Sequence, residues 1–458
     1  MSGATQKKVS FHTVGCRLNQ YETEQMAAAL YSYGFRRTTR HERADLCIIN
    51  TCTVTRRADT ANLRLVQKAA RENPGAKIVL AGCYVDANAK CVGDIQHVDL
   101  TVVNREKSQL AEILSRELSD LFEVEPRCNI GEPLDLFARL NRALLKISDG
   151  CDQRCAFCIL PRVRGPLKNR PPLEIVDEVR RLRQLGFEEV VLTGVNIGHY
   201  RHRTGADEPE ARSLAQLCRL ILDETDLPRL RLSSVEPQAI RDELLTLCAE
   251  SGGRICRHFH IPLQSGSSRL LRLMHRPYDQ QTYLNRVDEA RATRPNTTIG
   301  ADIIVGFPGE TDRDFAETLA LVDSGLLDYL HVFSYSDRPG TAASAMQDKV
   351  RPKIVSERRD LLVALSDRLW ANAHVRQVGE TLGVIAERGR LNRTARYGIA
   401  DNYINVKLPT DFAGRREIQQ VKITSATDGY AEGEVVSPHS TGIPIVPVPL
   451  EILSVHTS

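Results

Sequence analysis

The sequence predicts an α/β protein with an N-terminal βαβ domain around a parallel sheet, a central partial TIM-type (β/α)6 barrel, and a small C-terminal β-barrel. Three observations lead to this prediction. Short β-rich runs alternate with helical stretches near the N-terminus, six more runs continue the alternation, and the tail holds short β-rich runs separated by Gly and Asp turns. With 458 residues, too many for one core, we expect domains at 1–135, 136–372 and 373–455.

The composition is that of a folded protein. Hydrophobic residues make up 42% of the chain, charged residues 26%, and the net charge is +3, which excludes extended disorder and a polycation. No apolar stretch is long enough for a membrane span, and the N-terminus lacks the apolar core of a signal peptide. These features predict a cytoplasmic protein without a membrane partner. In that reducing compartment the twelve cysteines are expected to be metal ligands, redox groups or small core residues.

Four β-rich runs with helical stretches between them predict the N-terminal sheet. The runs are KVSFHTV (8–14), DLCIIN (45–50), KIVLAG (77–82) and DLTVVN (99–104). Cys16, Cys52 and Cys83 follow the first three of these runs. Because parallel strands end at the same edge of a sheet, these cysteines are expected to meet there although they are far apart in the sequence.

Six further runs predict the central barrel. They are ALLKIS (143–148), EVVLTG (189–194), LRLSS (230–234), HFHIP (258–262), IGADIIVG (299–306) and YLHVFSY (329–335). Active sites of such barrels are built from the loops that follow the strands. The first run is followed by SDGCDQRCAFCILPRVRG (148–165), which contains three cysteines within eight positions and no fourth.

Cys151, Cys155 and Cys158 have several possible roles. Their spacing also fits one face of a buried helix, but their polar and flexible neighbours and Pro161 favour a loop. A closed zinc site needs four ligands, and no Cys or His follows nearby. Three thiolates on a 4Fe-4S cluster leave one iron open, and that iron can accept the amino and carboxylate groups of S-adenosylmethionine. We therefore interpret the missing ligand as the functional feature.

The pattern C-x3-C-x2-C, with Phe157 before its last cysteine, resembles the radical S-adenosylmethionine signature. FHTVGCRLNQYETE, NTCTVT and AGCY resemble the N-terminal domain of the methylthiotransferases. LTGVNIGHY, RLSSVEP, HIPLQSGS, DIIVGFPGET and HVFSYSDRPGTAA resemble the barrel segments of that family in the same order, and the tail resembles its OB-like TRAM RNA-binding domain. The resemblance covers nearly the whole chain.

This resemblance implies two 4Fe-4S clusters. One, on Cys151, Cys155 and Cys158, would reduce S-adenosylmethionine to a radical that activates the substrate. The other, an auxiliary cluster on Cys16, Cys52 and Cys83, would supply sulfur, and a second S-adenosylmethionine the methyl group. An adenine C2–H bond is neither acidic nor electrophilic enough for acid-base replacement, so a radical route suits that chemistry.

Within the family, GCRLNQYETE and LTGVNIGHY resemble the MtaB group, which is similar in acting on tRNA with N6-threonylcarbamoyladenosine beside the anticodon. Arg17-Leu18-Asn19 stands where the isopentenyladenosine group more often has Gln-Met-Asn and the ribosomal-protein group Pro-Lys-Asn. Asp86 departs from the pattern, in which a Gln is expected. The resemblance implies conversion of that nucleoside to its 2-methylthio derivative, with the tRNA anticodon stem-loop as partner and an electron donor such as flavodoxin or ferredoxin.

Two alternatives remain at this point. The same chemistry on N6-isopentenyladenosine in tRNA, or on an aspartate of a ribosomal protein, is disfavoured by residues 17–19. A non-catalytic iron-sulfur protein that binds RNA or transfers electrons predicts four ligands per cluster, and the incomplete cysteine sets disfavour it.

Residues at strand ends are candidates for cofactor contacts, with turn formation or shielding of the cluster as the alternative roles. They are Phe157, Gly194, Asn196, Ser234, Glu236, Gln264 and Gly306. Cys256, His258 and His260 alternate onto one strand face and would suit a metal ion, but we favour core and barrel-lining roles, with His260 near the pocket.

The segment 387–406 is basic and carries aromatic residues. Arginine contacts RNA phosphates and aromatic rings stack on bases, whereas a solvated basic loop is the alternative. The RNA-binding candidates are Arg388, Arg390, Arg393, Arg396, Tyr397 and Tyr403. Arg162 and Arg164 are expected either to touch substrate phosphate or to pair with acidic neighbours.

Overall fold

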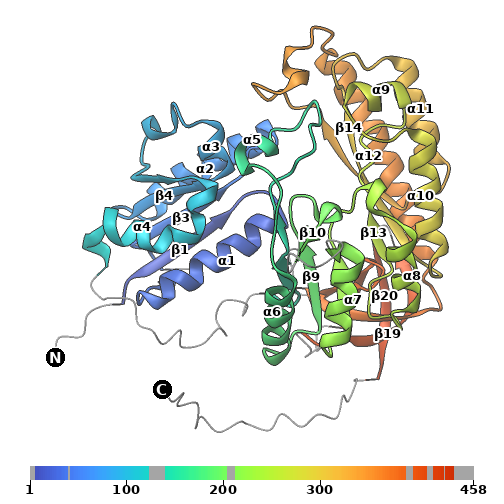
Figure 1. Ribbon diagram of the computed structural model, residues 1–458, viewed down its shortest axis with the longest axis horizontal. Helices are drawn as coiled ribbons and strands as arrows, with labels where there is room; N and C mark the ends of the chain where they lie inside the picture. The colour runs from blue at the N-terminus through green and yellow to red at the C-terminus, as the bar shows by residue number, and fades with distance from the viewer. Residues whose placement is uncertain are drawn as a thin grey trace.

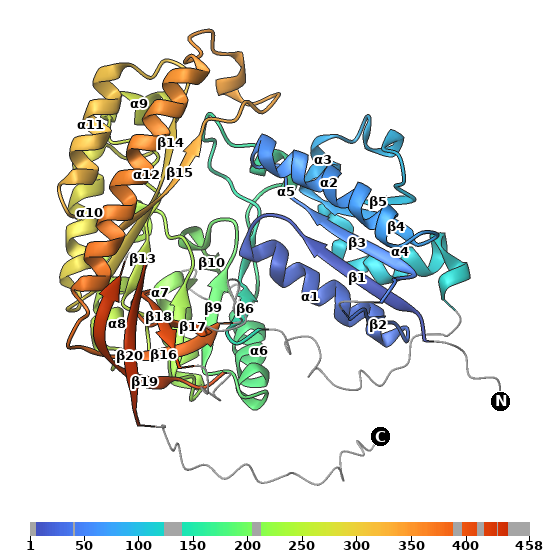
Figure 2. The same cartoon turned by 180° about the vertical axis from the view of Figure 1, so that it is seen from behind.

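The structure, a computed structural model, describes residues 6–39, 42–122, 140–203, 212–387, 396–409, 416–427 and 429–437. Figure 1 shows the N-terminal domain beside the central barrel, and Figure 2 shows the C-terminal β-barrel at one end of that central barrel. The predicted α/β class and the order of its three parts are confirmed.

The N-terminal sheet has five parallel strands in the order β2-β1-β3-β4-β5. The strands are β1 (Lys8–Thr13), β2 (Arg36–Arg37), β3 (Leu46–Thr51), β4 (Lys77–Gly82) and β5 (Leu100–Val102). Alternate residues of β3 face opposite layers. Ile48 packs with α1 (Arg17–Ser32) and α4 (Leu110–Glu117), and Ile49 packs with α2 (Arg56–Glu72) and α3 (Cys83–Ala87). Helices therefore cover both faces, as a parallel sheet requires.

Six parallel strands form the open central barrel. They are β6 (Ala143–Lys146), β9 (Glu189–Thr193), β12 (Arg229–Leu232), β13 (His258–His260), β14 (Thr298–Val305) and β15 (Tyr329–Ser334). They pair as two three-stranded sheets, which a parallel bridge between Leu230 and Ile255 joins. The outer helices are α6 (Pro172–Gln184), α7 (Leu214–Glu224), α8 (Asp242–Glu250), α10 (Gln280–Ala292), α11 (Asp312–Asp323) and α12 (Pro352–Val375). The largest apolar core lies between these strands and helices.

Shorter strands and helices lie in the loops of the central barrel. They are β7 (Ser148–Asp149), α5 (Leu160–Arg164), β8 (Lys168–Asn169), β10 (Arg201–His202), β11 (Arg212–Ser213) and α9 (Ser268–Leu273). In both views α5 lies between the N-terminal domain and the barrel. The segment that follows the first barrel strand is thus also a contact between domains.

The C-terminal strands close into a barrel in the order β16-β17-β18-β20-β19 around their own apolar core. They are β16 (Thr381–Glu387), β17 (Arg396–Ala400), β18 (Asn405–Leu408), β19 (Gln419–Thr427) and β20 (Tyr430–Ser437). Only β18 and β20 pair in parallel among these strands.

This small barrel docks on the N-terminal ends of the central strands. Glu189, the first residue of β9, binds Arg229 Nε at 2.5 Å and Arg231 Nε at 2.7 Å. The two guanidinium groups donate onward to the backbone oxygens of Gly383 at 2.6 Å and Ala400 at 2.8 Å. The small barrel therefore closes the end of the central barrel opposite to the cysteine loop.

The first predicted domain boundary, at residues 135 and 136, lies outside the described residues. Helix α12 runs to Val375, past the second predicted boundary at residue 372, and links the central barrel to β16. Both boundaries stay predictions. Among the described residues, no helix combines the length and the apolar character that crossing a membrane requires.

Candidate active site

The loop with Cys151, Cys155 and Cys158 is fixed by backbone contacts. Gly150 adopts φ +68°, and a Cβ there would lie 2.0 Å from the backbone oxygen of Pro166, so only glycine fits. Cys151 N donates to the oxygen of Gly165 at 3.1 Å, and Ala156 N donates to that of Met274 at 2.9 Å. The loop is therefore held in place without any bound group.

The thiols of this loop lie near one another and are partly buried. Burial raises the pKa of Cys158 to about 12, with Cys155 and Cys151 as further causes in the same direction. Burial also raises the pKa of Cys155, which the nearby Arg276 opposes. Such thiols become thiolates when a cationic metal centre binds them, because the metal charge offsets their burial and their repulsion.

Arg276 connects this loop to Glu236. Its Nη1 lies 3.2 Å from Cys155 Sγ, its Nη2 donates to Glu236 Oε2, and its side chain is buried. Burial raises the pKa of Glu236, and Arg276 opposes that shift. Arg276 could not be predicted from the sequence, because its partners lie 40 and 121 residues away and no motif spacing links them.

Cys16, Cys52 and Cys83 come from neighbouring strands of the N-terminal sheet. Cys16 precedes α1, Cys52 follows β3 directly, and Cys83 begins α3 after β4. Burial raises the pKa of Cys52 to about 12, and Cys16 and Cys83 act in the same direction. The structure thus brings the three thiols to one sheet edge, while their role as ligands stays a prediction.

The spacing of the thiols fits a cluster better than a single ion. Among the described residues, only His260, Asp302 and His331 bring three potential ligand atoms within 4.8 Å of one another. Neither cysteine set is as tight as a mononuclear zinc site, whereas a multi-iron cluster holds its thiolates farther apart.

A polar cradle beside Cys151 fits S-adenosylmethionine. Asn196 Nδ2 lies 3.8 Å from Cys151 Sγ, and Asn196 Oδ1 and Ser148 Oγ are buried without a hydrogen-bond partner. A Cβ at Gly194 would lie 2.3 Å from Ser148 Oγ, so glycine keeps this space open. Buried polar atoms normally have partners, which the polar groups of the cofactor would provide.

The other predicted cofactor residues have varied surroundings. Phe157 packs in a small apolar cluster with Phe307, and Ser234 is exposed. Gln264 adopts φ +68° and joins β14 through its backbone, with N donating to the oxygen of Asp302 at 2.7 Å. Gly306 has φ +75°, and a Cβ there would lie 2.4 Å from Val355. Each contact with the cofactor stays a prediction.

The predicted RNA-binding residues divide into three groups. Arg388, Arg390 and Arg393 lie outside the described residues. Arg396 is exposed on β17, and the neighbouring Tyr397 ring lies 5.7 Å from that of Tyr430. Tyr403 instead contacts the central barrel: its ring stacks on His258 at 4.3 Å and its hydroxyl accepts a hydrogen bond from Arg17 at 2.8 Å.

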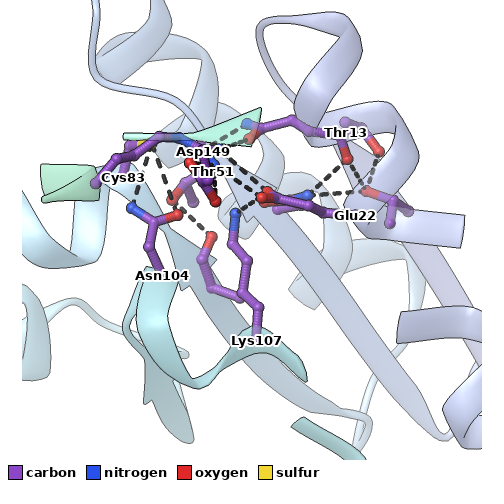
Figure 3. Close-up of polar contacts among 12 residues, drawn as sticks. Thr13, Glu22, Thr51, Cys83, Asn104, Lys107 and Asp149 are labelled. Atoms are coloured by element: carbon purple, nitrogen blue, oxygen red, sulfur yellow. Dashed lines mark hydrogen bonds and ion pairs between the residues drawn. The ribbon is translucent and has the colours of Figure 1, made fainter. Parts of the chain in front are cut away.

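A buried ionic network that no sequence motif indicates lies behind the auxiliary cysteines. Figure 3 shows Lys107 pointing at Glu22, with an Nζ to Oε2 distance of 2.8 Å. Arg164, from α5, donates to both Glu22 oxygens at 2.8 and 3.1 Å and to Asn19 Oδ1 at 2.7 Å. Of the two roles considered for Arg164, pairing with acidic neighbours is the one observed.

Asp86, the departure from the family pattern, supports a cysteine indirectly. Its Oδ2 accepts hydrogen bonds from Asn104 N at 2.9 Å and Nδ2 at 3.0 Å. That same Nδ2 lies 3.4 Å from Cys83 Sγ, as Figure 3 shows. Asp86 therefore orients a hydrogen-bond donor toward the sulfur. Residues that bind metals are commonly supported by hydrogen bonds of this kind from their neighbours.

Comparisons with known proteins agree with this geometry. Residues 8–103 match the uncharacterized protein family UPF0004, and residues 145–322 match the Radical SAM superfamily. The threonylcarbamoyladenosine tRNA methylthiotransferase MtaB of Bacillus subtilis is 34% identical over 93% of this chain and 96% of that protein. This chain belongs to the radical S-adenosylmethionine methylthiotransferase family. As a member, it is an enzyme that uses 4Fe-4S clusters and S-adenosylmethionine.

Two other relatives help to place this methylthiotransferase. MtaB of Rickettsia prowazekii is 35% identical over 91% of this chain and 95% of its own length. The tRNA-2-methylthio-N(6)-dimethylallyladenosine synthase of Bacillus pumilus is 34% identical over 94% and 86%. The radical S-adenosylmethionine methyltransferase TsrM from Kitasatospora setae shares the fold, with a TM-score of 0.54 over 84% of this chain and 79% of that one at 14% identity.

Proposed function

We propose that this enzyme converts N6-threonylcarbamoyladenosine beside the anticodon of tRNA to its 2-methylthio derivative. The observation that carries the proposal is the pair of three-thiol sets, one on a single loop and one at the edge of the N-terminal sheet, each one ligand short of a closed cluster, in a chain similar to MtaB over nearly its full length. An open iron at each cluster is what radical generation and sulfur delivery require.

The two cysteine loops have separate tasks in this proposal. When bound, the cluster at Cys151, Cys155 and Cys158 with S-adenosylmethionine supplies radical chemistry for the C2–H bond, and the cluster at the other three cysteines supplies sulfur. The chain holds the loops in a fixed relation through Arg164, which follows the first loop and binds Asn19 and Glu22 on the helix after Cys16. The substrate C2 would therefore lie between two rigidly linked sites.

The relatives differ in the N6 substituent of the adenosine for which they are named. The Bacillus subtilis protein named for threonylcarbamoyladenosine and the Bacillus pumilus protein named for dimethylallyladenosine are both 34% identical to this chain. Overall identity does not choose between these substrates. Arg17 favours the first, because it places a cation beside the auxiliary loop, where it donates to Tyr403.

We also propose that the C-terminal barrel binds the tRNA anticodon stem-loop. Arg396 and Tyr397 lie on the same small barrel as Lys407 and Tyr430, whose ammonium and ring are 5.6 Å apart. A cation beside aromatic rings suits the phosphates and bases of an anticodon stem-loop. Delivery of single electrons requires a donor such as flavodoxin or ferredoxin, and tRNA modification with reduced clusters suits the cytoplasm.

A reaction with defined RNA tests this function. The reconstituted enzyme is incubated anaerobically with S-adenosylmethionine, a reductant and a stem-loop that carries either N6-threonylcarbamoyladenosine or N6-dimethylallyladenosine. We expect the methylthio product, detected by mass spectrometry of nucleosides, from the first RNA only. Product from the second RNA alone would overturn the substrate assignment, and Cys155→Ala serves as the control without radical chemistry.

A further inference from the structure

Three neighbouring strands of the barrel each contribute one polar side chain to a cluster that the chemistry above does not use. His260 comes from β13, Asp302 from β14 and His331 from β15, and we call this set the lumen triad. Asp302 Oδ1 lies 2.9 Å from His260 Nε2 and 3.3 Å from His331 Nδ1. The two imidazole rings stack with centroids 4.8 Å apart.

The lumen triad faces the inside of the open barrel. On β15, Leu330 and Val332 pack into the core against the outer helices. Strand residues alternate between faces, so His331 points the other way, where its side chain is 52% exposed. Asp302 is 23% exposed and His260 is buried, so the triad is accessible from the side of His331.

Tyr329 and His258 hold His260 from the side away from Asp302. The Tyr329 hydroxyl lies 3.2 Å from His260 Nδ1 and 2.9 Å from His258 Nε2. Tyr403, from the C-terminal barrel, stacks on His258 and closes this end of the lumen. Both ring nitrogens of His260 therefore have hydrogen-bond partners, which fix the orientation of that ring.

Chains of side-chain contacts link the triad to both cysteine sets. On one side, Tyr329 and Tyr403 stack with centroids 5.9 Å apart, and Tyr403 accepts a hydrogen bond from Arg17, the residue after Cys16. On the other side, Asp302 is close enough to Glu236 to raise its pKa, and Glu236 pairs with the Arg276 that touches Cys155. An adenine base whose C2 lies between the two cysteine sets would thus have the lumen triad within reach.

The polar atoms of the lumen triad suit one kind of N6 substituent. His331 Nε2 and Asp302 Oδ2 have no hydrogen-bond partner among the described residues. An imidazolium that donates to a carboxylate through one nitrogen still offers an N–H on the other, which a substrate carboxylate can accept. Asp302 Oδ2 can accept from a hydroxyl or amide N–H. A threonylcarbamoyl group carries all three of these groups, whereas a dimethylallyl group would leave the polar atoms unpaired.

The charges around the triad permit an anion. Arg17 lies beside the Tyr403 ring and donates to its hydroxyl, with no carboxylate partner among the ion pairs of the described residues. Glu236 is neutralised by Arg276, and Glu189 by Arg229 and Arg231. The Asp302 carboxylate is hydrogen-bonded to two imidazoles. Two histidines and a carboxylate also form a donor set for a divalent ion, and their ligand atoms lie within 4.8 Å of one another.

We propose that the lumen triad is the specificity site that binds the carboxylate-bearing N6 substituent of the substrate adenosine, with His331 as the residue that contacts the carboxylate. This inference rests on the proposed function and extends it to named residues.

The test compares two stem-loop RNAs that differ in one group. One carries N6-threonylcarbamoyladenosine, and the other carries its carboxamide analogue, in which the carboxylate is neutral. We measure the Kd of each for the reconstituted enzyme and for His331→Phe, which keeps a ring but removes both nitrogens. The wild type is expected to bind the carboxylate RNA about tenfold or more tightly, the size of one charge-assisted hydrogen bond, and the ratio is expected to fall to near one in the variant.

Several controls make the outcome decisive. His331→Gln offers a neutral amide NH2 donor in place of the imidazole and is expected to give an intermediate ratio. Iron content shows whether each variant keeps its clusters. An unchanged ratio in His331→Phe, in an enzyme that still converts threonylcarbamoyladenosine, overturns the inference and leaves the proposed function intact. Failure of the wild type to convert that nucleoside overturns the proposed function itself. Tight cobalt(II) binding that requires His331 would assign the triad to a metal and also overturn the inference.

Discussion

Gly15 is a residue whose role is set by a single missing atom. It adopts φ +97°, and a Cβ there would lie 2.6 Å from Cys52 Cβ and 2.8 Å from Cys52 Sγ. We expect Gly15→Ala to displace Cys52 and abolish the auxiliary cluster, so that iron per chain falls from about eight to about four atoms.

The matched control for this change is Gly34→Ala. Gly34 has a similar φ of +85° but nothing within 4 Å of the added Cβ. Both variants carry the backbone strain of a left-handed alanine, about 1–2 kcal/mol, and only the first adds a clash. Iron and sulfide analysis of both proteins checks the prediction, and equal cluster content in the two would contradict it.

Arg276 serves both Cys155 and Glu236. Replacement by Gln leaves the Glu236 carboxylate poorly paired in a buried place, at a cost of about 3–5 kcal/mol in the free energy of unfolding. It also weakens a hydrogen bond to Cys155 Sγ, the proposed cluster ligand, so we expect a more negative reduction potential for the cluster bound there. Denaturant unfolding and a redox titration measure the two effects.

Arg272→Gln is the control for Arg276. Arg272 is exposed and lies four residues away on the same segment, so its replacement should change stability by no more than about 0.5 kcal/mol. A reduction potential that moves equally in both variants would show that the contact with Cys155 has no electronic effect.

At the scale of elements, Glu22 of α1 joins that helix to α5 through its ion pair with Arg164. Burial opposes ionisation of Glu22, but Lys107, Arg164 and Lys146 hold its pKa well below the usual value. Because the folded pKa is lowered, this contribution to stability is complete above the unfolded pKa of about 4.3 and declines as the pH falls below it.

We therefore expect Glu22→Gln to lose about 3–5 kcal/mol of unfolding free energy near pH 7, since it leaves buried cations unpaired. The difference from the wild type should shrink below about pH 4. Urea unfolding of the cluster-free proteins at several pH values measures this, with the exposed Glu72→Gln as control. A difference that grows toward acid would contradict the account.

The sequence predicted most elements because their local patterns are strong. Strand β3 begins with four consecutive apolar residues and was expected within one residue of its bounds. Strand β2, only Arg36 and Arg37, has no β pattern and was not predicted. The strand expected at 258–262 ends at His260, because Pro262 has no N–H to continue a ladder.

The candidate site was predictable to a more limited extent. The meeting of Cys16, Cys52 and Cys83 follows from strand order alone, because each cysteine directly follows or closely trails a parallel strand. Glu22 and Lys107 were not predictable, since 85 residues separate them and neither belongs to a motif with functional spacing. The lumen triad joins three strands whose residues look like ordinary barrel lining in the sequence.

For the whole molecule, the docking of the C-terminal barrel depends on Glu189. Its carboxylate is fully buried, and Arg229, Arg231 and Arg142 hold its pKa below the usual value against the effect of burial. We expect Glu189→Gln to loosen the small barrel, because the guanidinium groups that bridge to Gly383 and Ala400 lose their counter-charge.

Limited proteolysis measures this loosening as faster release of a C-terminal fragment. Glu224→Gln, at an exposed ion pair with Arg180, should behave like the wild type. Because Tyr403 reaches the lumen only when the small barrel is docked, the loosened variant should also bind substrate RNA more weakly. Unchanged proteolysis would show that apolar contacts alone hold the barrels together.

The central claim is that this molecule adds a methylthio group to threonylcarbamoyladenosine in tRNA. Its most direct test is mass spectrometry of tRNA nucleosides from cells that lack the protein, complemented with the intact chain, Cys155→Ala or Cys52→Ala. We predict loss of the 2-methylthio nucleoside, accumulation of plain threonylcarbamoyladenosine, and rescue by the intact chain alone. An unchanged level of the methylthio nucleoside in cells without the protein would contradict the account.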